Sequence, residues 1–310
     1  MKQINQMNEV NKRRHSKVAR KETTTAYLCL IPAFLGLTFI SYIPTVAAFI
    51  LSFFEWNGMT KPKFIGIDNY INIFTLDTYF LPSLKATLVY AALAVVSSLI
   101  YSLIIAVFLN MKIPAKTFFR AVYFIPYMLP AIGVFTAWRW LYEVNYGLFN
   151  YINRLLGITN MGYLDKPGQV LPSLALIAVW CSGNLIIIFM AGLQNVPMVY
   201  REAAQIDGAN SWQRFWKITI PCISPIIFYN LLMSLIANLQ VVTPALAITN
   251  GGPQNASMFM SYIIYRYAFS KYKIGYAAAY AGIFFVLVGI FTVILFATSK
   301  NWLFYGDEGD

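Results

Sequence analysis

Polar side chains inside apolar stretches are the residues of this sequence that could contact a polar solute. Ser234, Asn238 and Gln240 fall within seven residues of one apolar segment. Ser234 and Asn238 are one helical turn apart and would share a face. Hydroxyl and amide groups are costly inside a bilayer unless they face a cavity or another helix. They could therefore hydrogen-bond a hydroxyl-rich solute, or they could only bond across helix interfaces.

The preceding apolar segment carries a similar set, Trp180, Ser182 and Asn184. An aromatic face beside amides suits a sugar-like solute. The same residues could equally be structural, since Ser and Asn commonly join helices in membranes.

Residues for catalysis or metal binding are scarce. His15 is the only histidine and lies in a polar tail, and the three cysteines, Cys29, Cys181 and Cys222, lack the spacing of a metal site. The sequence has no Walker A motif, GxGxxG or GxSxG. We expect no catalytic residue, no metal site and no cofactor bound by this chain, so that any energy source lies on another subunit.

The elements that would position these residues are membrane helices. The 310 residues are 59% hydrophobic and only 11% charged, with a mean hydropathy of +0.60. Six stretches have the length of a membrane span, roughly 20 apolar residues. They are 27–54, 88–110, 122–138, 171–196, 226–248 and 274–298. Pro126 and Pro130 predict a kink in the third. The first is too long for a signal peptide, so we expect it to be retained.

The distribution of charge predicts the orientation. The basic tail 1–25 precedes the first helix, where Lys and Arg meet anionic lipid, so its charge does not indicate nucleic-acid binding. With the N-terminus inside, the cytoplasmic segments carry 14 Lys and Arg and the outer segments nine. We predict an all-α integral membrane protein with both termini in the cytoplasm, a membrane domain over 26–300 and a tail over 301–310.

One polar loop, 197–224, is too patterned for a linker. Pro197 suits a helix start, Gly208 permits a reversal, and Asn210 or Ser211 can cap a second helix that ends at Pro221. A helix-turn-helix on the cytoplasmic face would be a rigid element through which a partner protein could exert force. The same loop could instead be an interfacial helix whose aromatic residues rest at the lipid boundary.

The loop resembles the EAA motif of the permease subunits of bacterial binding-protein-dependent ABC importers. Glu202-Ala203-Ala204, then Gly208, then Ile218-x-Ile220-Pro221 follow that pattern, with Ile220 where the motif usually has Leu. Three features resemble the sugar-type, maltose-like branch. They are Phe64-x-Gly66-x-x-Asn69-Tyr70, Asp207-Gly208-Ala209 and Thr249-x-Gly251-Gly252-Pro253. The resemblance extends from the first helix to the last.

The resemblance implies the type I ABC importer permease fold and a carbohydrate importer of the bacterial inner (cytoplasmic) membrane. Glu202, Ala203, Ala204, Asp207 and Gly208 would contact the ATPase. The implied partners are a second homologous permease subunit, two ATP-binding subunits that hold ATP and Mg, and an extracytoplasmic sugar-binding protein.

The implied substrate path uses five of the polar and aromatic residues above. Ser234 and Asn238 match sugar-contacting positions of maltose-type relatives, and Gln240 is a polar neighbour. Trp180 and Asn184 lie near the corresponding region of the fourth helix.

Other functions remain open from the sequence. The solute could be a polyol, a glycerol phosphate or another small molecule. An ion-coupled secondary transporter would also be all-helical, but it usually buries acidic residues, and the six predicted helices contain essentially none.

Overall fold

The computed structural model describes residues 22–111, 113–159 and 161–304. These residues are largely helical, with one two-stranded hairpin. Three helices are individually long and apolar enough to cross a membrane, and three bent pairs bring the total to six if each pair forms one span. The predicted all-α membrane fold is confirmed.

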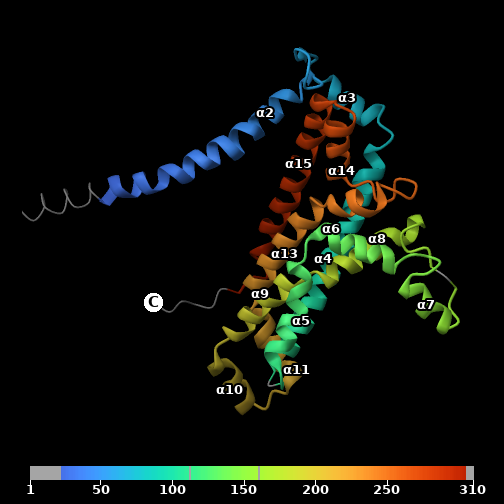
Figure 1. Ribbon diagram of the computed structural model, residues 1–310. Coiled ribbons are helices and arrows are strands. Elements are labelled where there is room, and N and C mark those ends of the chain that lie inside the picture. Colours follow the sequence, from blue (N-terminus) through green and yellow to red (C-terminus); the bar gives the residue numbers. More distant parts are fainter. Residues whose placement is uncertain (1–21, 112, 160, 305–310) are drawn as a thin grey trace, which may run out of the picture.

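The first span, Glu22–Leu51, projects away from the bundle (Figure 1). It contains a π turn, η1 (Thr38–Tyr42), and ends as α2 (Ile43–Leu51), which packs against α15 (Ile274–Ser299). Pro44 explains the π turn, because its ring clashes with the carbonyl four residues earlier and it has no N–H. The helix starts within the predicted tail 1–25, and residues 1–21 lie outside the described part.

Helix α4 (Phe80–Asn110) is the centre of the bundle. It packs against α8 (Pro167–Trp180), α9 (Gly183–Gln194) and α13 (Ser224–Leu239). Its buried face carries small alanines and serines, which let neighbouring backbones approach closely. It begins at Phe80 rather than at the predicted Leu88. The apolar run is interrupted at Lys85, but the helix includes this residue, and Pro82 is tolerated in a first helical turn.

Proline interrupts the predicted third helix, 122–138. The structure has α5 (Lys116–Met128) and α6 (Ala131–Leu141), with 98° between them. Pro130 caps α6 and Leu129 is extended, as expected of a residue that precedes proline. The predicted kink is therefore present, as a complete break.

Two further predicted helices are also divided. The range 171–196 contains α8 and α9, which meet at 51°. The range 226–248 contains α13 only to Leu239, and a π turn, η3 (Ala245–Thr249), follows Pro244. Pro244 explains why α13 does not continue, because it has no N–H to donate and it disfavours the helical conformation of the residue before it.

A hairpin and a short helix follow the first span. Strands β1 (Phe54–Glu55) and β2 (Lys63–Phe64) pair antiparallel, and α3 (Asp68–Thr75) comes next. Asn69 Nδ2 donates to the carbonyl oxygens of Ser52 at 2.8 Å and Phe54 at 3.0 Å. Tyr70 donates to Ser52 Oγ at 2.8 Å. Two residues of the Phe64–Tyr70 motif therefore fix the end of the first span.

Asp77 joins the α3–α4 junction to the last part of the chain. That part contains α14 (Met260–Tyr265), a π turn, η4 (Arg266–Ser270), and α15. Asp77 Oδ2 accepts hydrogen bonds from Tyr267 at 2.7 Å and Tyr276 at 3.0 Å. Lys271 Nζ lies 4.5 Å from the centre of the Tyr267 ring. Burial raises the pKa of Asp77, but hydrogen bonds from tyrosines and a backbone N–H outweigh it, so the net pKa is below its ordinary value.

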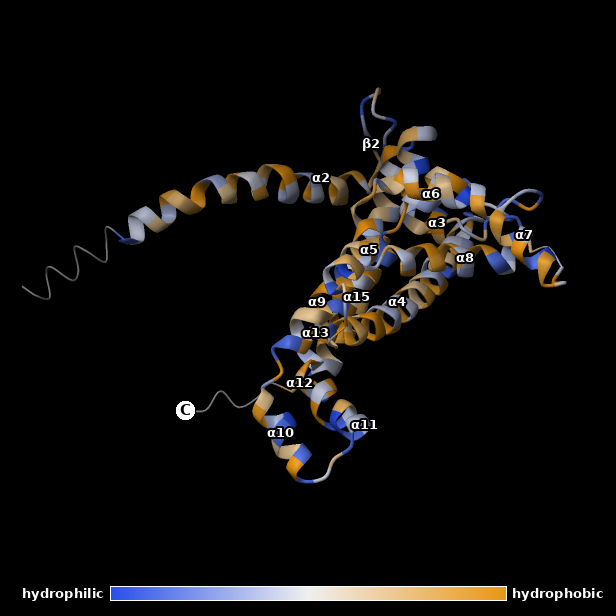
Figure 2. Ribbon diagram, turned by 60° about the horizontal axis from the view of Figure 1, so that its bottom comes forward, coloured by the Kyte–Doolittle hydropathy of each residue, from blue (hydrophilic) through white to orange (hydrophobic). Residues whose placement is uncertain are grey.

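Polar residues gather at the two ends of the bundle. Figure 2 shows hydrophilic stretches at α10 (Met198–Ile206) and α11 (Ser211–Arg214) at one end and around β2 at the other. Short α7 (Leu148–Leu155) lies to one side. Between the ends, two buried apolar clusters form the core.

Candidate functional site

The polar loop forms a helical hairpin at one end of the bundle (Figure 1). Helix α10 follows Pro197, and Gly208 reverses the chain with a φ of +81°. Of the two capping candidates, Asn210 caps α11: its side chain accepts from Gln213 N–H, and the Gln213 side chain accepts from Asn210 N–H. This reciprocal pair is a capping box, which defines the start of the helix.

The second helix of the hairpin ends at Cys222, one residue after its predicted end at Pro221. A π turn, η2 (Phe215–Thr219), leads into α12 (Ile220–Cys222), and α13 follows at 65°. The π turn ends two residues before Pro221, in the same way as η1 before Pro44. The wider turn accommodates the proline, and the helix ends one residue after it.

The EAA residues lie on the outside of this hairpin. Glu202, Ala203, Asp207 and Gly208 are exposed, and Ala204 is half-buried. Ile206 is 87% exposed. Within the described residues, no hydrogen bond engages the Glu202 carboxylate. The hairpin therefore presents a carboxylate and an apolar side chain at its surface.

The polar residues of α13 differ in their surroundings. Ser234 is buried, Asn238 is half-buried, and Gln240 is exposed at the end of the helix. Asn238 Nδ2 donates to Ser234 O at 2.8 Å and to Ser234 Oγ at 3.2 Å. The amide nitrogen is thus bonded within α13 and not across a helix interface, as the structural interpretation of these residues predicted.

The break between α8 and α9 positions the other predicted set. Trp180 ends α8 and is 39% exposed, whereas Asn184, in the first turn of α9, is half-buried. Ser182 is buried and accepts a 2.9 Å hydrogen bond from Ser102 of α4. Ser182 therefore joins helices, while Trp180 remains available for contact.

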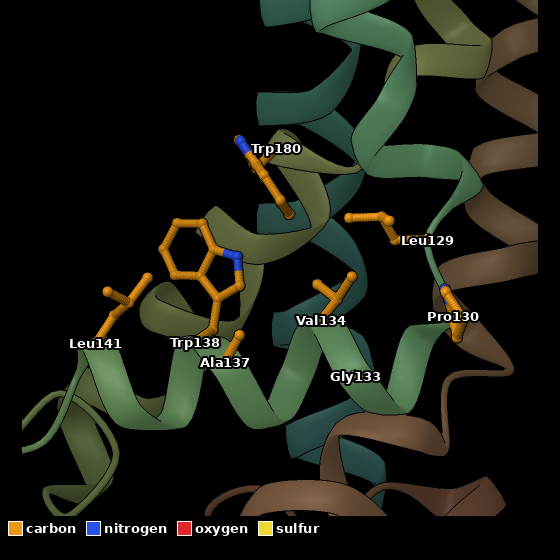
Figure 3. Close-up of a pocket in the computed structure, with 8 residues that line it drawn as sticks. All are labelled: Leu129, Pro130, Gly133, Val134, Ala137, Trp138, Leu141 and Trp180. Carbon is orange, nitrogen blue, oxygen red and sulfur yellow. The ribbon is translucent and has the colours of Figure 1, made fainter.

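Trp180 lines an apolar cavity of about 360 Å³ at the bend between α5 and α6 (Figure 3). Trp138 of α6 lies edge-to-face with Trp180, with ring centres 5.6 Å apart. Figure 3 shows Trp138, Val134, Leu129 and Trp180 projecting into the same space. The polar residues of α13 and Asn184 are not among the lining residues. The structure therefore does not bring the five predicted residues into one pocket.

Trp138 lines this cavity but is not among the candidate residues named from the sequence. Its signal was the nearby Pro130, since a break at that proline turns α6 toward the end of α8. Aromatic faces of this kind can stack against the apolar face of a sugar ring.

The Thr249–Pro253 motif forms a tight turn after α13. Ser257 Oγ donates to Thr249 Oγ1 at 2.6 Å and lies 2.5 Å from Gly252 O. Gly251 has a φ of +86°, and a Cβ there would clash with Met258. A polar cavity of about 270 Å³ beside the turn is also lined by Arg139 and Glu143. The motif residues therefore hold a turn.

The family can be decided from the extent of the match to known proteins. Residues 101–303 match the family described as binding-protein-dependent transport system inner membrane component. This chain belongs to that family. The permease identification made from the EAA loop is confirmed, and the match includes α8, α9 and the hairpin.

The similarity of this permease to its relatives extends over nearly its whole length. It is 37% identical over 294 residues to the probable ABC transporter permease protein YesP of Bacillus subtilis, with 94% of this chain and 95% of YesP covered. It is 35% identical over 279 residues to the multiple sugar-binding transport system permease protein MsmF of Streptococcus mutans, with 88% and 94% covered.

A solved structure has the same fold. It is a bacterial alginate ABC transporter in complex with an alginate pentasaccharide-bound periplasmic protein. One of its chains matches this permease with a TM-score of 0.77 at 20% identity, covering 91% of this chain and 96% of the other. The type I importer permease fold expected from the sequence is therefore confirmed.

Proposed function

We propose that this permease is one channel-forming subunit of an ATP-driven carbohydrate importer in the bacterial cytoplasmic membrane. The observation that carries the proposal is the capped hairpin with an exposed Glu202 at the end of the bundle. A protruding, rigid element is what an ATPase needs in order to move the helices behind it. The names of the sugar-transport relatives support carbohydrate as the solute.

The hairpin is connected to the helices that would have to move. Arg201 Nη2 donates to Leu193 O at 3.0 Å and so joins the hairpin to α9. Arg214 Nη1 donates to Gln205 Oε1 at 3.0 Å and so joins the two helices of the hairpin to each other. Directly after the hairpin, α13 carries Ser234 and Asn238. Displacement of the hairpin by closing ATPases would therefore be transmitted to the polar residues of the proposed path.

The remaining parts of the importer would come from other chains. A second, similar permease would complete the path, and two ATP-binding subunits would hold ATP and Mg. An extracytoplasmic sugar-binding protein would deliver solute at the opposite end, near the hairpin β1–β2. ATP binding would open the path outward, and hydrolysis would reset it inward. This chain would bind lipid and solute and would catalyse no reaction.

Charge reversal at Glu202 tests the coupling role. Glu202→Lys should abolish recovery of the ATPase when the tagged permease is purified in mild detergent, because the carboxylate is replaced by a cation at the contact. The second permease should still be recovered. The measurement is quantitative mass spectrometry of the purified complex.

Asp165→Lys is the matched control, since Asp165 is also exposed but lies on the loop before α8. It should leave ATPase recovery unchanged. A stable wild-type complex without any ATPase would contradict the proposal and favour an ion-coupled transporter.

A further inference from the structure

A cavity of about 310 Å³ lies behind the hairpin, at the ends of α4 and α9. Its lining includes Arg201, Arg214, Ser211, Thr219 and Asn110. Two of the lining residues are arginines and none is Asp or Glu. The cavity therefore concentrates positive charge without a carboxylate to balance it.

Arg201 has a hydrogen-bonding position that is not satisfied. Its Nη2 donates to Leu193 O, but its Nε is buried and has no hydrogen-bond partner within the described part of the chain. A buried donor without an acceptor is costly, and charged donors cost most. A guanidinium presents its N–H groups as a planar fork that matches phosphate oxygens. Arg201 thus lacks an anionic acceptor.

Arg214 is held in place by neutral groups. Its Nη1 donates to Gln205 Oε1 at 3.0 Å and its Nη2 to Ser211 Oγ at 3.2 Å. These bonds fix the direction of the guanidinium but do not neutralise it. Ser211 and Thr219 add hydroxyl groups that can donate to an anion.

The residues around this cavity are of the kinds found at a membrane boundary. Helix α4 ends at Asn110, and the nearby aromatic residues Trp212 and Trp216 are 70% and 51% exposed. Trp is enriched where a membrane meets water. Basic pockets between membrane helices on the cytoplasmic side commonly bind phospholipid headgroups. Only the assignment to the cytoplasmic side rests on the proposed function.

We propose that this cavity binds the phosphate group of an anionic phospholipid from the cytoplasmic leaflet, between the guanidinium groups of Arg201 and Arg214. The phosphate accepts hydrogen bonds from guanidinium N–H groups that face the cavity and balances the two positive charges. The acyl chains leave past Trp212 and Trp216. The bound lipid braces the hairpin against α4 and α9, so membrane composition influences how firmly the coupling loop is held.

Lipid titration of the purified complex tests this site. Native mass spectrometry measures phosphatidylglycerol binding to the complex that contains the full chain, with phosphatidylcholine as the reference lipid. Arg201→Gln combined with Arg214→Gln should weaken phosphatidylglycerol binding about tenfold, equivalent to about 1.4 kcal/mol. Lys217→Gln removes a charge from the same hairpin, but Lys217 is exposed and does not line the cavity. It should change binding less than about twofold.

Arg214→Gln alone provides a second variant if the double variant does not assemble. Its binding should fall by about threefold, roughly half of the tenfold effect in free energy. Equal phosphatidylglycerol binding by wild type and by the arginine variants would overturn the proposal, as would an equal loss in Lys217→Gln.

The source of the phosphate is decided by a separate titration with inorganic phosphate. Saturable binding of inorganic phosphate to the complex, without any preference for phosphatidylglycerol, would show that the site takes a soluble anion and would overturn the lipid assignment. Loss of the ATPase rather than of lipid in the arginine variants would show a protein contact and also overturn it. Failure of lipid binding with normal ATPase recovery would leave the importer proposal intact.

Discussion

Two asparagines on α13 illustrate how little residue type says about role. Asn230 is fully buried, and its Nδ2 lies 3.4 Å from Leu185 O of α9. Asn238 lies two turns further on, is half-buried and bonds within its own helix. A buried amide between helices is a structural feature, whereas a partly exposed amide remains accessible to a solute.

Asn238→Ala should slow solute uptake by roughly three- to tenfold, the equivalent of one neutral hydrogen bond. The complex should assemble normally, because the only described partner of the Asn238 amide is Ser234 in the same helix. Uptake into proteoliposomes, normalised to assembled complex, measures the effect.

Asn230→Ala is the comparison for that variant. It should lower the melting temperature of the complex, since Leu185 O loses a buried donor. Normal uptake by Asn238→Ala would contradict a place for Asn238 in the path and leave the helix bond as its role.

Short motifs at the element scale hold the ends of helices. Asn69 and Tyr70 fasten α3 to the end of the first span, and Asn210 with Gln213 starts α11. Gly275, at the start of α15, lies so close to the backbone of Phe54 that a Cβ at this position would clash with it. These residues determine where the spans begin and end.

Asn69→Ala should destabilise the junction between the first span and α3. One buried and one partly buried carbonyl oxygen lose their donor, a loss of roughly 2 kcal/mol. Thermal unfolding of the purified complex should occur at lower temperature. Asn72→Ala, on the same helix but without a described side-chain hydrogen bond, should unfold near the wild-type temperature. Equal melting temperatures for the two variants would refute the role given to Asn69.

Asp77 acts at the scale of the whole molecule, because it joins residues separated by 190 positions or more. Its pKa is held below the ordinary value by the tyrosine hydrogen bonds, which outweigh the effect of burial. A carboxylate with a lowered pKa in the folded state adds stability above its unfolded pKa of about 3.9. That stability is lost as pH falls further, through the folded pKa.

The melting temperature of wild-type permease should therefore drop as the pH is lowered from about 5 to below 4. Asp77→Asn should have a lower melting temperature at pH 7 and a weaker pH dependence, since the amide cannot titrate. Differential scanning fluorimetry at several pH values compares the two. Parallel curves for the two proteins would show that Asp77 does not contribute.

Much of the candidate site was predictable because its signals are local. The EAA spacing, Gly208 and the capping residues act within a few turns of chain, so they fix the hairpin without reference to other helices. The apolar cavity between Trp138 and Trp180 was not predictable to the same degree. Trp138 and Trp180 meet only because two separate spans break, and nothing local to either tryptophan encodes the other.

The sequence by itself determined the family, the apolar spans and the helical hairpin at 197–224. Hydropathy and motif spacing are properties of consecutive residues. A long enough apolar stretch forms a stable membrane helix wherever it occurs in the chain. The tertiary structure alone decided the 98° bend, the cavity between Trp138 and Trp180, and the arginine cavity behind the hairpin. Each of these depends on which helix surfaces meet across the bundle, and such contacts join residues far apart in the chain.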